Sequence, residues 1–156
     1  MIQVKNALQL AAMRDAGRIT GEALLAARDS LREGMTTYEL DKIIRAYIEK
    51  QGAKPSFLGY AGFPGSACIS INDEVIHGIP AKNRILQEGD IVKIDVGAFY
   101  KGYHGDAART IPVGRASENA EKLLLQGMLG NAVMVVKACL STPADVESGV
   151  NVCFAP

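Results

Sequence analysis

Two aspartates, Asp95 and Asp106, could together bind a metal ion. They lie in the stretch KIDVGAFYKGYHGDAART, residues 93–110, and are eleven positions apart (106 − 95 = 11). Carboxylate oxygens suit a divalent cation, or a pair of cations about 3.5 to 4 Å apart that carboxylates bridge. The alternative is a solvated hairpin that carries two unrelated acidic residues, and the spacing alone favours this alternative.

The surrounding pattern predicts a β-hairpin, with a first strand over residues 91–99, a turn at Lys101-Gly102 and a second strand over residues 103–113. Side chains alternate along a strand, so Asp95 points away from the apolar face. That apolar face comprises Val92, Ile94, Val96 and Ala98. The turn places Asp106 diagonally across from Asp95 on the same face, together with His104. Like charges on neighbouring strands repel by up to ~1 kcal/mol, so a positive group is expected between them.

Two helices are expected to support this hairpin. Asn6 with Gln9 predicts the start of a helix that runs to Leu31, before Gly34. Thr36 and Glu39 form a capping box for a second helix, which has a clear apolar face and ends at Gly52. Both stripes of apolar residues are typical of a core, so the helices are interpreted as scaffold.

Residues 54–66, KPSFLGYAGFPGS, predict a glycine-rich loop with aromatic residues Phe57, Tyr60 and Phe63. These rings either line an apolar subsite or pin the loop to the core, and both alternatives stay open. Residues 67–71 predict a short strand. His77 follows a turn and precedes a glycine, so a loop position is expected from which its imidazole could reach a ligand. Taken alone, it is expected to be a surface residue.

The composition indicates one soluble cytoplasmic domain. The 156 residues are 48% hydrophobic, which is enough for a sizeable core. Lys+Arg and Asp+Glu both total 17, so no net charge favours nucleic acid or an anionic membrane. No apolar run approaches the ~20 residues of a membrane span, and no signal peptide pattern is present. Cys68, Cys139 and Cys153 lack C-x-x-C spacing and are interpreted as reduced thiols. With two histidines, any metal site must be mostly carboxylate.

The stretches SINDEVIHGIP and KIDVGAFYKGYHGDAART resemble the type I methionine aminopeptidases. AAMRDAGRI, GMTTYELD and FLGYAGFPGSACISIN extend the resemblance in the family's order over roughly residues 4 to 122. The resemblance implies the α/β (α+β) pita-bread fold, an antiparallel sheet with covering helices. Residues 1–122 would form its first half, and residues 123–156 a divergent tail that is helical and then irregular.

The resemblance also implies a function, namely removal of the initiator methionine from nascent polypeptides, with the ribosome as a place of encounter. Asp95 corresponds to a bidentate ligand of one metal, and Asp106 to a ligand that bridges two. A complete site would hold two divalent cations (Co, Mn, Fe or Zn), which activate water and polarise the scissile carbonyl. His77 corresponds to a catalytic residue that contacts the substrate near the scissile peptide. The positions that line the methionine pocket correspond to Phe57, Tyr60, Phe63 and Cys68.

The sequence departs from the family after Asp106. The family's site takes a further histidine and two glutamates from its second half, whereas no histidine follows Asp106 here. Glu118, Glu121 and Glu147 do not lie in the family's glutamate motifs. The chain alone is therefore expected to be weakly active or inactive, and the alternative is a non-catalytic binding module or an inert fragment of the same fold. A proline-specific aminopeptidase fits less well, because FLGYAGFP resembles the methionine pocket. Self-association through the uncovered sheet is also expected.

Overall fold

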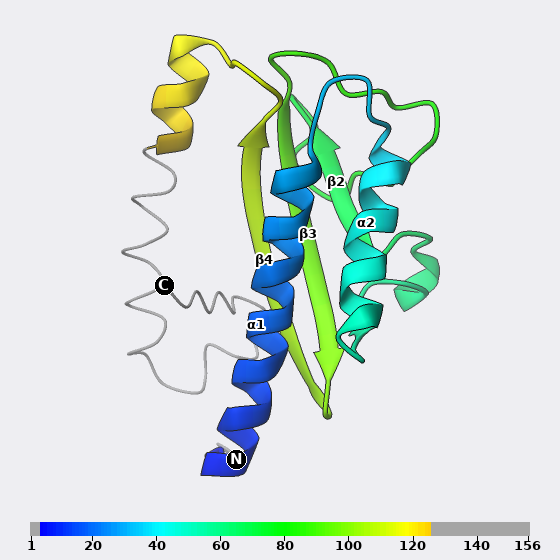
Figure 1. Cartoon of the computed structure of the whole chain (residues 1–156), viewed down its shortest axis with the longest axis vertical. Helices are drawn as coiled ribbons and strands as arrows, with labels where there is room; N and C mark the ends of the chain where they lie inside the picture. The colour runs from blue at the N-terminus through cyan, green and yellow to red at the C-terminus, as the bar shows by residue number, and fades with distance from the viewer. Residues whose placement is uncertain (1–3, 126–156) are drawn as a thin grey trace.

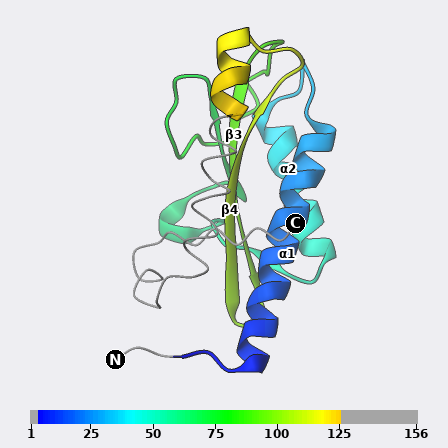
Figure 2. The same ribbon diagram turned by 90° about the vertical axis from the view of Figure 1, so that its left-hand side faces the viewer.

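Residues 4–125 are described by the computed structural model of this chain, as one antiparallel sheet with two helices against one of its faces (Figure 1). The helices are α1 (Ala7–Ser30) and α2 (Thr37–Lys50). The strands are β1 (Lys54–Pro55), β2 (Ala67–Ile71), β3 (Ile91–Tyr100) and β4 (Tyr103–Pro112), and a short 3-10 turn covers Tyr60–Gly62. Figure 2 shows the sheet on edge, with both helices on one side and the loops that follow α2 on the other. One face of the sheet is therefore free of helices among these elements.

Both helices begin where the capping residues predict. The side chain of Asn6 accepts from the backbone of Gln9 at 2.9 Å, and Gln9 returns a bond to the backbone of Asn6. Thr36 and Glu39 make the same reciprocal pair at the start of α2. Each box satisfies backbone donors that the first helical turn leaves free, so both starts are encoded locally.

A two-residue turn at Lys101 and Gly102 joins β3 to β4 and fixes their register. Their φ angles of 49° and 86° are left-handed, which matches the twist of a hairpin with so short a connection. Tyr100 pairs with Tyr103 directly before and after the turn. The predicted strands are confirmed to within a residue, because β3 ends at Tyr100 and β4 at Pro112.

The core lies between the helices and the predicted apolar face of β3, whose four residues Val92, Ile94, Val96 and Ala98 are fully buried. Helix α1 packs closely over β4 at Gly105. A Cβ atom at Gly105 would lie 2.4 Å from the Ala16 carbonyl oxygen and 2.5 Å from the Thr20 hydroxyl. Only glycine allows the strand and the helix to approach so closely.

The short strand β1 differs from the sequence prediction. Residues 54 and 55 were expected in a loop, but β1 pairs there with Phe99 and Ala98 of β3. A two-residue edge strand with a proline carries no periodic pattern, so sequence gives no signal for it.

Residues 118–125 are helical after Ser117, as predicted, whereas the predicted interruptions at residues 127 and 130 and the irregular tail lie outside the described residues. No helix in the described part is long and apolar enough to cross a bilayer.

Candidate metal and peptide site

The two aspartates lie on the sheet face opposite the helices. Asp95 pairs with Ala108, and Asp106 pairs with Gly97, so the aspartates are diagonal neighbours on adjoining strands. Paired residues of an antiparallel sheet project to the same face, and that face is opposite to the one bearing the buried valines and isoleucine. The predicted register is confirmed.

A third strand adds Cys68 beside this pair. Cys68 of β2 pairs directly with Asp95, so its thiol projects to the same face. Farther along the same edge of β3, the loop after β1 approaches Gly97, where a Cβ atom would lie 2.8 Å from the Ser56 Cβ and 2.9 Å from the Phe57 ring. The absence of a side chain at Gly97 therefore lets the aromatic loop pack beside the aspartates.

All the predicted site residues line one cavity of about 600 Å³. His77, on the loop after β2, lies at this cavity together with both aspartates and Cys68. Tyr60 is 76% exposed, which places its ring at the mouth rather than in the core. The full lining is Phe57, Tyr60, Ala61, Gly62, Phe63, Pro64, Cys68, His77, Ile79, Asp95 and Asp106. The cavity thus combines aromatic and apolar lining residues with two carboxyl groups.

Burial and mutual repulsion disfavour two charged carboxylates at this place. Desolvation, then the nearby charge of Asp106, raise the pKa of Asp95 from 3.8 to about 6, and the charge of His77 opposes this rise. Desolvation also raises the pKa of Asp106, against the charge of His104. Burial, followed by the charges of Asp95 and Asp106, raises the pKa of the Cys68 thiol to about 11. The site therefore favours protonation or a bound cation.

The donor set fits a divalent cation held from one side. Asp95 and Asp106 supply hard carboxylate oxygens, which suit Mn²⁺, Co²⁺ or similar ions, and among the described residues no lysine or arginine lines the cavity to compensate their charge. Within residues 4–125, no group of three or more His, Cys, Asp and Glu side chains could hold a metal. The pair therefore accounts for part of a coordination sphere.

His104 shares the sheet face with Asp106 but has a different partner. Its Nδ1 lies 2.9 Å from the Ser56 hydroxyl, and its ring lies 4.6 Å from that of Phe99. These contacts hold the imidazole above the β1 end of the hairpin. Sequence reasoning placed His104 on the correct face but did not identify Ser56, whose position depends on the unpredicted β1 pairing.

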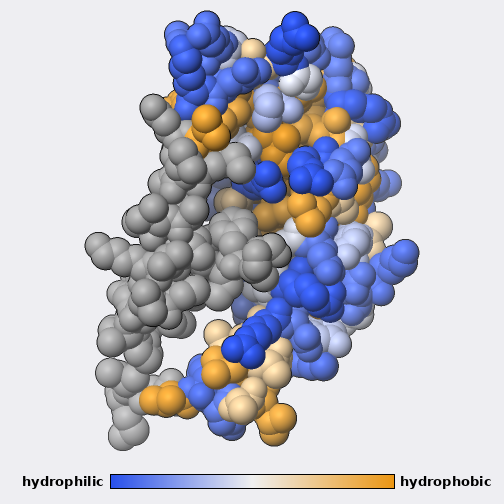
Figure 3. All heavy atoms as spheres, turned by 60° about the vertical axis from the view of Figure 1, so that its left-hand side comes forward, coloured by the Kyte–Doolittle hydropathy of each residue, from blue (hydrophilic) through white to orange (hydrophobic). Residues whose placement is uncertain are grey.

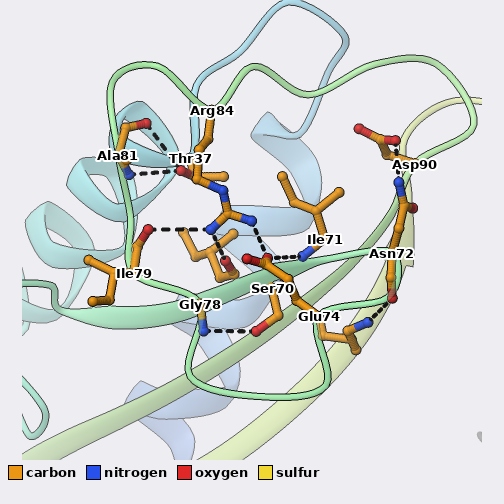
Figure 4. Close-up of polar contacts among 12 residues, drawn as sticks. Thr37, Ser70, Ile71, Asn72, Glu74, Gly78, Ile79, Ala81, Arg84 and Asp90 are labelled. Carbon is orange, nitrogen blue, oxygen red and sulfur yellow. Dashed lines mark hydrogen bonds and ion pairs between the residues drawn. The ribbon is translucent and has the colours of Figure 1, made fainter.

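Sequence reasoning also missed the residues that hold the His77 loop. Figure 4 shows Ser70 near the end of β2, and Glu74 and Arg84 in the segment that follows, all making polar contacts with this loop or the strand. Their contacts join residues up to fifteen positions apart in the chain, and no local pattern reports such contacts. The sequence indicates this support only through the charged residues Glu74 and Arg84, which lie on either side of His77.

The comparisons with known proteins agree with this geometry. Residues 11–140 match the model of "Metallopeptidase family M24". The methionine aminopeptidase of Clostridium acetobutylicum is 52% identical over 124 residues, which cover 80% of this chain and 50% of that protein. Methionine aminopeptidase 1 of Bacillus subtilis is 49% identical over 124 residues, with coverage of 80% and 50%. The chain spans about half the length of the curated relatives it matches.

Solved structures give the same result for the fold. The crystal structure of methionine aminopeptidase from Thermotoga maritima superposes with a TM-score of 0.76 at 38% identity, and covers 80% of this chain and 50% of its own. The prolidase from Pyrococcus horikoshii gives 0.67 at 28% identity, over 78% of this chain and 33% of its own. The arrangement of sheet and helices is therefore that of the pita-bread proteins, and the predicted fold class is confirmed.

Proposed function

Because this chain belongs to metallopeptidase family M24, we propose that its cavity binds the N-terminal methionine of a polypeptide beside a carboxylate-held divalent cation. The activity proposed is that of a methionine aminopeptidase acting on nascent chains in the cytoplasm. The observation that carries the proposal is the single cavity that joins the aromatic loop, His77 and both aspartates. Chemistry and side-chain selection would then take place in one space.

Each wall of the cavity has a distinct part in this proposal. Phe57, Phe63 and Cys68 offer an apolar surface that selects an unbranched thioether side chain largely by shape. His77 reaches the cavity from a loop on the same side as Asp95 and can hydrogen-bond the peptide next to the bond to be cleaved. Asp95 and Asp106 would hold the cation, which when bound polarises the scissile carbonyl and activates water.

The same observations support a second function, which is binding without turnover. The described residues supply two carboxylates, and no group of three or more His, Cys, Asp and Glu side chains among them is placed to hold a metal. A cation held by so few protein ligands keeps an incomplete and poorly oriented set. We propose that the chain alone binds methionyl peptides and divalent ions and releases little methionine. A partner that completes the ligand set would raise the rate.

The test uses the purified chain with Mn²⁺ or Co²⁺ and the peptide Met-Ala-Ser. Calorimetry measures binding of the ion and of the peptide, and chromatography measures released methionine. Methionine release that is lost in Asp106→Ala but kept in Glu118→Ala would support the aminopeptidase activity. Glu118 is a suitable control because its side chain is 81% exposed and pairs with Lys122. Binding without release would support the binding module. Absence of both binding heats would overturn the proposal.

A further inference from the structure

The loop that carries His77 is anchored to β2 at Gly78. The Gly78 carbonyl accepts from the backbone of Ile69 at 2.8 Å, and its N–H donates to the Ser70 hydroxyl at 3.0 Å. A Cβ atom at Gly78 would lie 2.2 Å from the Ile69 carbonyl oxygen. The residue after His77 therefore lies directly against the strand, and no other residue type fits there.

Arg84 ties the rest of the loop to the same strand (Figure 4). Its guanidinium forms an ion pair with Glu74 and donates to the carbonyls of Ile69 at 3.3 Å and Ile79 at 3.4 Å. The Glu74 carboxylate also accepts from the backbone N–H of Ile71 at 2.9 Å. One planar side chain thus links the two limbs of the loop with the strand between them, which a flexible ammonium cannot reproduce.

The apolar side chains of the loop between these points are largely exposed in the described part of the chain. Val75 and Ile76 are 78% and 67% exposed, so their side chains contribute little burial. His77 itself has a φ of 59°, in the left-handed region that costs energy for a residue with a Cβ. A strained residue on a loop without buried side chains keeps its conformation only if polar contacts fix the backbone around it.

We propose that Arg84 is a positioning residue for His77: by linking Glu74, Ile69 and Ile79, it holds the backbone that directs the imidazole into the cavity. The importance of this for peptide binding rests on the proposed function. The positioning itself concerns only residues 69–84. Glu74 binds Arg84 directly, and Ser70 supports the same loop separately through the Gly78 N–H.

The test exploits the fact that the chain has two histidines. In the full chain labelled with ¹³C at histidine Cε1, each imidazole gives one NMR signal, and His104, held by Ser56, serves as an internal reference. Arg84→Gln is expected to shift and broaden the His77 signal and leave the His104 signal in place. The matched control is Arg45→Gln, which breaks an arginine–glutamate pair on α2 instead. An unchanged His77 signal in Arg84→Gln would overturn the proposal.

A second variant guards against loss of the fold. Glu74→Gln keeps an oxygen for the Ile71 N–H but removes the charge that Arg84 binds, so the His77 signal is expected to shift in the same direction. If Arg84→Gln loses the His104 signal as well, this variant decides the outcome. A Glu74→Gln spectrum identical to that of the unmodified chain would then overturn the proposal.

Peptide affinity provides a second readout. Arg84→Gln is expected to weaken Met-Ala-Ser binding about tenfold, and to have no further effect when His77 is already alanine, because both changes remove one interaction. Fully additive losses would indicate a merely structural Arg84 and overturn the proposal. If the unmodified chain binds no peptide, the proposed function fails, while the NMR result still decides whether Arg84 positions His77.

Discussion

Cys68 lies directly opposite Asp95 in the β2–β3 pair, and burial raises the pKa of both side chains. The Cys68 thiol offers Asp95 no positive charge with which to pair. Asp106, diagonal to Asp95, adds a like charge. The carboxyl groups of this cavity are therefore unfavourable as bare anions.

Without metal, Asp95 should make the chain more stable in mild acid than at neutral pH. Its folded pKa of about 6 lies above the ordinary 3.8, so the folded state binds the proton more tightly. Stability from this group increases as pH falls through about 6 and levels off below about 4. Asp95→Asn should raise the free energy of unfolding by about 1 to 2 kcal/mol near neutral pH, after allowance for solvent screening.

Urea unfolding of the metal-free chain and of Asp95→Asn, at about pH 7 and about pH 4, tests this prediction. The gain should disappear at the lower pH, where the aspartic acid is also neutral. An Asn variant that is less stable at neutral pH would show that the charge is already compensated.

Divalent cations should stabilise the chain through the two aspartates. Mn²⁺ at a hundredfold excess over its dissociation constant would add about 2.7 kcal/mol to the free energy of unfolding. Asp106→Asn should weaken this binding at least about tenfold, because it removes one of two anionic ligands. Thermal melts with increasing Mn²⁺ measure the effect, and Asp29→Asn, on the exposed end of α1, is the control. Equal shifts of the melting temperature in the unmodified chain, Asp106→Asn and Asp29→Asn would show that the ion binds at another site.

The close approach of α1 and β4 predicts opposite effects for two glycine substitutions. Gly105→Ala places a methyl group against Ala16 and Thr20 and should destabilise the fold by about 1 to 3 kcal/mol. Gly17 also lies on α1, but a Cβ atom there would meet no atom within 4 Å. Gly17→Ala should therefore stabilise the fold by about 0.5 to 1 kcal/mol. Denaturant midpoints of the two variants decide, and a tolerated Gly105→Ala would refute the tight contact.

The sheet face that bears the site should promote self-association. Ala108 and Asp106 of β4 are exposed on this face, and β4 pairs only with β3 among the described strands. Figure 3, which brings the β4 side of the molecule forward, shows hydrophobic residues among hydrophilic ones on that side. Ala108→Lys should lower the associated fraction in sedimentation velocity, since a charge on an edge strand opposes pairing. Ala11→Lys on α1 is the control, and a chain that is monomeric at all concentrations would contradict this expectation.

Much of this arrangement could be predicted because its causes are local. The capping pairs at Asn6 and Thr36 act within one turn, and the Lys101-Gly102 turn alone fixes which residues of β3 and β4 face each other. The shared face of the aspartates followed from these features. The roles proposed for the individual site residues stay predictions, because they depend on ligands and not on the backbone.

The features that could not be predicted depend on distant contacts. Strand β1 forms because Lys54 and Pro55 meet the end of β3, and its two residues carry no pattern of their own. The left-handed backbone of His77 and the reach of Arg84 to Ile69 have no counterpart in neighbouring residue types. Residues that support a site from another part of the chain are visible only in three dimensions.

The turn at Lys101-Gly102 also limits insertions and deletions in the β3–β4 hairpin. Because successive strand residues alternate between the two faces, one codon gained or lost between Gly102 and Asp106 would rotate that carboxyl beneath α1, where Gly105 already touches the helix. Gains or losses in pairs would preserve the face but move the carboxyl along the strand and away from its neighbour. The short hairpin is therefore a segment whose length must be kept for the two carboxyl groups to stay neighbours on one face.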